Sequence, residues 1–72
     1  MNENIFGENI KRARIKQGLT QKQLAVILHV SHQCISKWEK GTVSPQVMWV
    51  YKIAKELKVK PADLLNSPNS RI

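Results

Sequence analysis

The stretch from Leu19 to Gly41 constrains the fold more than any other part of the chain, because it contains two helix-start signals in quick succession. Thr20 is a favourable N-cap, and Gln23 three residues later completes a Thr-x-x-Gln capping box. Residues 29–30 break the apolar pattern, and Ser31 is a second N-cap. The apolar stripe of the first helix consists of Leu24, Ala25 and Leu28. The stretch therefore predicts two short helices around a tight turn, a helix-turn-helix.

The second helix of this motif is predicted from residue 32 to residue 40 and has two chemically different faces. One face consists of Ile35, Trp38 and Glu39. The opposite face consists of Gln33, Ser36, Lys37 and Lys40, with His32 beside it in the first turn. Amide, hydroxyl and ammonium groups on one side of an exposed helix suit the DNA major groove, where base edges present donors and acceptors. A face that is merely solvated is the alternative.

The charge balance favours a polyanionic partner. The chain has 12 Lys and Arg against 5 Asp and Glu, a formal net charge of +7, and cations that neutralise phosphates release counterions when they bind DNA. A soluble basic protein without such a partner is the alternative. Because the lysines are spread along the chain rather than gathered on one amphipathic segment, a membrane surface is a poorer match.

Chemistry other than binding finds little support in the sequence. Cys34 is the only cysteine, so no internal disulfide can form, and we expect a protein of a reducing, cytoplasmic compartment. Neither a transmembrane run nor a signal-peptide pattern is present. His29 and His32 have a spacing that some metal sites use, but no further ligands support them. Without paired carboxylates, a Ser-His-Asp set or a glycine-rich phosphate loop, we expect no enzyme activity, metal, cofactor or small-molecule substrate.

Several segments together resemble the Cro/lambda-repressor type of helix-turn-helix, also called XRE-like. They are Thr20-Gln21-x-Gln23-Leu24-Ala25, Val30-Ser31, Ile35-Ser36-x-Trp38-Glu39-x-Gly41, Pro45 and Ile53-Ala54. The resemblance covers about residues 6–65. It implies an all-α, five-helix lambda-repressor-like DNA-binding domain, with the helix-turn-helix formed by the second and third helices. It also implies a transcriptional regulator that often works as a dimer on a double-stranded DNA operator, here a small Cro-like repressor of a phage or prophage lysis–lysogeny switch.

The N-terminal part predicts a first helix that packs against the motif. Asn4 is its expected N-cap, the helix runs to about Gln17, and Gly18 is its C-cap. The stripe that faces the core consists of Phe6, Ile10 and Ala13.

The chain after the motif predicts two more helices. Ser44 as N-cap with Pro45 at the first helical position starts a helix to about Leu57, and Pro61 opens a short fifth one. The stripe of the fourth helix consists of Val47, Val50, Ile53, Ala54 and Leu57. The remaining apolar positions are Val59, turned inward, and the apolar end of the fifth helix, Leu64 and Leu65. We expect residues 1–65 to form one domain and residues 66–72 a flexible tail.

The resemblance assigns DNA contacts to the motif. The residues expected to read bases are His32, Gln33, Ser36 and Lys37. Gln33 is the strongest candidate because its amide can pair bidentately with adenine, and Lys37 can reach guanine acceptors. Phosphate contacts are expected from Gln21, at a helix N-terminus that favours anions, and from Lys40 and the backbone and hydroxyl of Thr42. Weaker phosphate candidates are Arg12 and Lys11.

Two further features follow from the same comparison of residues. The family pairs the position of Arg14 with the acid that corresponds to Glu39, which predicts a partly buried ion pair; a free phosphate contact is the alternative for Arg14. His29 stands where the family usually has a glycine with positive φ, which suggests strain or an altered turn, although histidine tolerates that region better than most residues.

Some positions that the family usually keeps polar are apolar here: Ile15, Val26, Ile27, Met48 and Trp49. The expected protein-partner surface consists of Val26, Ile27, Met48 and Trp49. Trp49 has two alternatives, a place over the edge of the core or against the DNA backbone. This surface supports a second hypothesis, an antirepressor or modulator that binds another phage repressor and has weak DNA affinity of its own.

Overall fold

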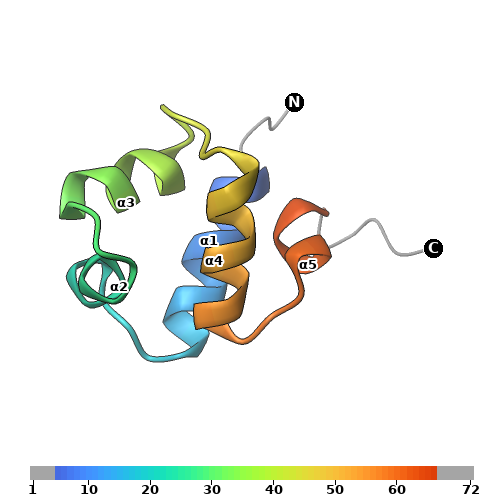
Figure 1. The fold of residues 1–72 in the computed structure, drawn as a ribbon, viewed down its shortest axis with the longest axis horizontal. Helices are drawn as coiled ribbons and strands as arrows, with labels where there is room; N and C mark the ends of the chain where they lie inside the picture. The colour runs from blue at the N-terminus through green and yellow to red at the C-terminus, as the bar shows by residue number, and fades with distance from the viewer. Residues whose placement is uncertain (1–4, 67–72) are drawn as a thin grey trace.

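The computed structural model describes residues 5–66, which form five helices. They are α1 (Ile5–Lys16), α2 (Gln21–Leu28), α3 (His32–Lys40), α4 (Val47–Leu57) and α5 (Pro61–Leu65). Figure 1 shows α2 and α3 together at one end of the molecule, α5 at the other end, and α1 and α4 between them. The predicted all-α, five-helix fold is confirmed. The predicted cap at Asn4 and residues 67–72 of the predicted tail lie outside the described residues.

The helix ends around the motif match the local sequence signals. Thr20 and Gln23 form both hydrogen bonds of the capping box. Ser31 accepts a hydrogen bond from the backbone N–H of Cys34, as an N-cap does. His29 ends α2 in the left-handed conformation with a φ of 60°. The turn therefore keeps the backbone geometry that a glycine would adopt, and the predicted strain is confined to one left-handed residue.

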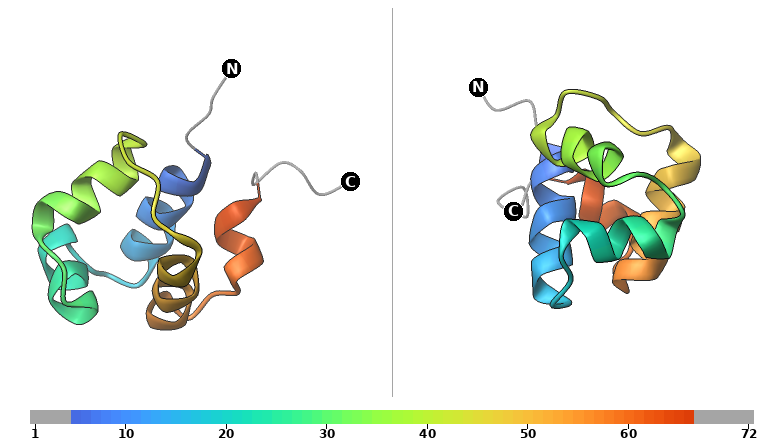
Figure 2. Two further views of the ribbon diagram at one scale, coloured as in Figure 1. Left: turned by 45° about the horizontal axis from the view of Figure 1, so that its top comes forward. Right: turned by 90° about the vertical axis from the view of Figure 1, so that its left-hand side faces the viewer.

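The start of α4 differs from the prediction. The helix begins at Val47, and its N-cap is Gln46 in an extended conformation, rather than Ser44 followed by Pro45. The chain between α3 and α4 crosses from one helix to the other (Figure 2). Extended residues span about 3.3 Å each and helical residues only about 1.5 Å. We infer that the crossing keeps Pro45 and Gln46 extended before the helix can begin.

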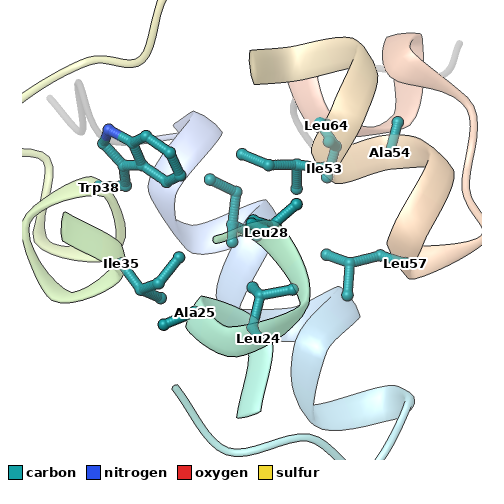
Figure 3. Close-up of a cluster of buried hydrophobic side chains, with 10 residues drawn as sticks. Leu24, Ala25, Leu28, Ile35, Trp38, Ile53, Ala54, Leu57 and Leu64 are labelled. Carbon is teal, nitrogen blue, oxygen red and sulfur yellow. The ribbon is translucent and has the colours of Figure 1, made fainter. Parts of the chain in front are cut away.

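The core draws side chains from every helix (Figure 3). The largest fully buried side chains are Ile10, Leu24, Ile35, Ile53, Leu57 and Leu64. Two apolar residues of the predicted pattern lie outside this core. Val47 is exposed because it is the first residue of α4, and Leu65 is exposed because the five-residue α5 is long enough to bury only one face.

A buried asparagine links α1 to α5. The Asn9 side-chain amide donates to the carbonyl oxygens of Leu64 at 2.9 Å and Asn66 at 2.8 Å. Arg12 Nη1 donates to the other side of the same amide, Asn9 Oδ1, at 3.1 Å. Asn66, which the sequence analysis assigns to the tail, is therefore held against the folded domain. Among residues 5–66 no helix has the length and apolar character needed to cross a bilayer.

Candidate nucleic-acid interface

Helix α3 separates its apolar and polar sides as predicted. Ile35, Trp38 and Glu39 are buried. Gln33 and Lys37 are exposed. Ser36 is half-buried at the margin between the two sides. Helix α3 lies at one end of the molecule (Figure 1), and the major groove of DNA is wide enough to admit an α-helix. The exposed polar side of α3 is therefore the side that such a groove would meet.

An ion pair fastens the inner side of α3 to α1. Arg14 Nε meets Glu39 Oε2 at 2.6 Å, and Arg14 Nη2 meets Glu39 Oε1 at 3.1 Å, a bidentate geometry. Arg14 Nη1 donates to the carbonyl oxygen of Leu19 at 2.7 Å. Both ionic side chains are buried. The guanidinium is fully engaged inside the protein, so the alternative of a free phosphate contact by Arg14 is wrong.

The polar network continues from this ion pair to the surface. Gln21 Nε2 donates to Glu39 Oε1 at 2.9 Å, and Gln21 Oε1 lies 3.0 Å from Nε2 of the exposed His32. We call the path Arg14–Glu39–Gln21–His32 the relay. It joins α1, α2 and α3 and ends on the first residue of the candidate reading helix. The side-chain amide of Gln21 uses one N–H and its oxygen in the relay, so its second N–H and its backbone N–H at the start of α2 are the groups that can meet a phosphate.

The candidate phosphate contacts differ in how well they are placed. Lys40 and Lys11 are exposed. The backbone N–H of Thr42 donates to the Lys37 carbonyl oxygen at 3.0 Å in the C-cap of α3, which makes its hydroxyl the better placed of the two expected phosphate contacts. Arg12 bonds Asn9 on the side of α1 that meets α5. Since residues 12 and 14 point about 160° apart on a helix, Arg12 lies away from the motif.

The predicted partner surface is divided between two helices, and one of its four residues is half-buried. Trp49 is half-buried against the core, with its ring 5.6 Å from the ring of Trp38 and the ammonium of Lys52 4.9 Å above it. The edge-of-core alternative for Trp49 is therefore the right one. Met48 is exposed, and so are Val26 and Ile27, which belong to a different helix.

The structure reveals an exposed apolar face on α4 that the sequence analysis missed. Val47, Met48 and Tyr51 are all exposed, and positions i, i+1 and i+4 share one side of a helix. Tyr51 went unnoticed because an isolated surface tyrosine is ordinary in a sequence. The signal that could have found this face was the spacing of Tyr51 from Val47.

Within the described part of the chain, no group of three or more His, Cys, Asp and Glu side chains could hold a metal ion. His29 forms the C-cap of α2, whereas His32 is turned to Gln21. Cys34 is a half-buried free thiol packed against the core. These three residues thus have separate surroundings.

Comparison with known proteins gives a consistent result. A sequence model of the family described as "Helix-turn-helix" matches residues 10–64. The HTH-type transcriptional activator BcrR of Enterococcus faecalis is 39% identical over 61 residues, which are 85% of this chain and 30% of BcrR. The cryptic phage CTXphi transcriptional repressor RstR of Vibrio cholerae is 31% identical over 68 residues, 94% of this chain and 61% of RstR. The chain thus spans less than two thirds of either relative.

A solved structure agrees with the sequence comparison. The solution structure of the SOS-response transcriptional repressor LexA from Eubacterium rectale superposes with a TM-score of 0.84 at 29% identity. The match covers 94% of this chain and 72% of the LexA chain. The arrangement of α1 to α5 is therefore one that a repressor domain also adopts.

Proposed function

Since this chain belongs to the XRE-type helix-turn-helix family of transcriptional regulators, we propose that it binds a specific DNA operator through the exposed side of α3. One observation carries the proposal: the buried Arg14–Glu39 pair and Gln21 hold α3 so that its polar side faces outward. Families of this type are typically not enzymes, and we propose the same for this chain.

The proposed base-reading residues are His32, Gln33, Ser36 and Lys37. Gln33 offers a donor and an acceptor that match adenine N7 and N6, and Lys37 offers donors that match guanine O6 and N7. Ser36 is less exposed than these two, so its contact depends on close approach of the groove floor. His32 stands in the first turn, the part of a recognition helix that enters the groove in this class of motif.

The proposed phosphate contacts surround this reading surface. They are the backbone and side-chain N–H groups of Gln21, the Lys40 ammonium, the Thr42 hydroxyl and, more weakly, Lys11. Such contacts fix the position of a protein on the duplex and carry no sequence information. The net charge of +7 supports these contacts, because lysines and arginines attract the phosphates of DNA whatever its sequence.

The biological setting that we propose is a Cro-like repressor in the cytoplasm of a bacterium or phage host. In a homodimer, two α3 helices would enter successive major grooves about 34 Å apart. Similarity to RstR, a phage repressor by its name, supports this sign of regulation. BcrR is an activator by its name, so a reporter gene placed behind the selected operator tests the sign directly.

Salt dependence of DNA binding tests the main proposal. Binding of a selected duplex should weaken steeply between low and moderate salt, with log K falling by about 0.9 per neutralised phosphate. Lys40→Ala should reduce that slope by about one contact. Lys55→Ala is the matched control, since Lys55 is also exposed but belongs to the C-terminal half of α4, away from α3 (Figure 1). Salt-insensitive binding, or equal slopes for both variants, would contradict the proposal.

A second candidate function is supported by the apolar face of α4. Val47, Met48 and Tyr51 could bind another repressor, as an antirepressor does. In that case DNA affinity would be weak and indifferent to sequence, while Met48→Lys would abolish binding to the repressor. Val26→Lys, at an exposed apolar site on α2, serves as the control and should leave that binding unchanged.

A further inference from the structure

We propose that the relay fixes His32 as a hydrogen-bond acceptor toward DNA, so that this residue reads the exocyclic amine of adenine or cytosine. The inference rests on the proposed function, because it concerns a residue of the same reading surface. It adds the polarity of the contact and the class of base that the contact selects.

The first step is the orientation of the Gln21 amide. Glu39 is paired with the Arg14 guanidinium, so its oxygens are carboxylate acceptors without a proton to donate. The Gln21 atom that lies 2.9 Å from Glu39 Oε1 must therefore be the NH2 nitrogen. The amide oxygen is consequently the atom that faces His32.

The second step is the position of the imidazole proton. The Gln21 amide oxygen can only accept a hydrogen bond, and it lies 3.0 Å from His32 Nε2. His32 must therefore carry its hydrogen on Nε2. A neutral imidazole has only one such hydrogen, so Nδ1 is left with a lone pair and acts as an acceptor.

The third step is the match to base edges. In the major groove, adenine N6 and cytosine N4 are amine donors, whereas guanine and thymine present only acceptors and, in thymine, a methyl group. An acceptor at His32 Nδ1 can pair with the first two bases. Guanine or thymine at the same position would place two acceptors against each other, which costs the hydrogen bond and leaves both atoms desolvated.

His32 therefore differs from its neighbour Gln33. The exposed amide of Gln33 can turn to present either its oxygen or its nitrogen. The imidazole nitrogen of His32 that carries the hydrogen is instead fixed by residues inside the protein, which lie in α1, α2 and the buried side of α3. The relay thus acts as a positioning device for a specificity-determining residue.

The tautomer can be measured without DNA. Nitrogen-15 NMR of the imidazole at pH 8, where histidines are mostly neutral, should show His32 protonated on Nε2 and unprotonated on Nδ1. Gln21→Met removes the acceptor at nearly constant side-chain volume and should abolish this preference. Lys22→Met changes the next, exposed residue of α2 and should leave the preference intact. Protonation of Nδ1 in the unaltered protein would overturn the proposal.

The base class is then measured on DNA. The preferred duplex is selected from a randomised pool, and the position sensitive to His32→Ala is identified. Adenine or cytosine should be favoured there over guanine and thymine by about three- to tenfold, the value of one hydrogen bond. Gln21→Met should relax that preference, Gln33→Ala should act at a different position, and His32→Lys, which only donates, should shift the preference to guanine.

The outcomes separate this inference from the proposed function. In one outcome the unaltered protein binds one duplex selectively and yet favours guanine or thymine at that position, and in another the His32→Ala variant keeps the same base preference. In either case the inference fails and the proposed function stands. If the unaltered protein selects no duplex at all, the proposed function fails and the base reading by His32 fails with it.

Discussion

Two polar contacts tie α1 to helices far away in the sequence, and they differ in where they end. The α1–α3 contact, Arg14 with Glu39, joins residues 25 positions apart and continues through Gln21 to the exposed His32. The α1–α5 contact, Asn9 with the carbonyls of Leu64 and Asn66, joins residues 55 and 57 positions apart. This contact ends on backbone atoms at the end of the molecule opposite α3 (Figure 1).

The chemistry of the two contacts explains this difference. A carboxylate can accept hydrogen bonds from Arg14 and Gln21 at the same time. The α1–α3 contact can therefore orient the Gln21 amide and, through it, the exposed imidazole of His32. A neutral amide that caps the end of α5 satisfies carbonyls that have no partner within the helix. We infer that the α1–α3 contact serves both the fold and the reading surface, and the α1–α5 contact the fold alone. The predictions below test that inference, beginning with the largest effect.

Arg14→Ala should cause the largest loss. It leaves the Glu39 carboxylate buried without its ionic partner, which typically costs about 3–5 kcal/mol in the free energy of unfolding. Urea unfolding followed by the fluorescence of Trp38 and Trp49 measures it. The double variant Arg14→Met with Glu39→Leu should be more stable than Arg14→Ala, because no buried charge is left unpaired.

The same double variant separates the two roles of the α1–α3 contact. It should fold, yet it should lose base preference at the His32 position, because Gln21 no longer has a carboxylate to orient it. Full retention of that preference would show that this contact serves the fold alone.

Asn9→Ala should cost less, about 1–3 kcal/mol for carbonyls left without donors. The loss should be local, since Asn66 is exposed and water can replace part of what the amide supplied. Amide hydrogen exchange should accelerate in α5 and hardly in α3. Base preference should be unchanged at every position, and an altered preference would contradict the division between the two contacts.

Local signals predicted much of this fold from sequence, and the residues show why. The caps at Thr20 and Ser31 depend on atoms within three residues, so sequence spacing contains them. The Arg14–Glu39 pair joins distant residues and was predicted only through the family resemblance. The contacts of Asn9 were not predicted, because its partners are backbone carbonyls, which any residue could supply, and no residue pattern indicates them.

What the sequence predicted wrongly or left open has a common physical origin. The start of α4 was wrong because the path from α3 to α4 overrode the preference of Ser44 and Pro45 for a helix start. For Trp49 the sequence left a partner surface, the edge of the core and the DNA backbone open, and packing against the ring of Trp38 places it at the edge of the core. In both cases the cause is the arrangement of the helices in space, which the spacing of residues along one helix cannot reveal.

Gln33→Ala sharpens the comparison from the DNA side. Gln33 is exposed on α3 and belongs to neither contact, so the free energy of unfolding should stay within about 0.5 kcal/mol of the original. Binding to the selected duplex should weaken by about 1–3 kcal/mol, and preference should relax at one base pair. A binding titration against single-base variants of the duplex checks this, and an unchanged profile would remove Gln33 from the reading surface.

The smallest effect concerns the turns that position the partners of the two contacts. His29 precedes α3 and Lys58 precedes α5, and both are left-handed, with φ of 60° and 61°. A left-handed conformation costs an L-residue about 1–2 kcal/mol, and a glycine avoids this cost. Its greater conformational freedom in the unfolded chain lowers stability by about 0.5–1 kcal/mol, which offsets part of the gain. His29→Gly and Lys58→Gly should therefore each raise the free energy of unfolding by about 0.5–1 kcal/mol.

DNA binding distinguishes these two glycine variants. His29→Gly also loosens the turn between Gln21 and His32, whereas Lys58→Gly changes only the approach to α5. We expect a small loss of base preference at the His32 position for the first variant and none for the second. Equal preference in both would mean that the hydrogen bonds of the relay, and not the stiffness of the turn, hold the imidazole in place.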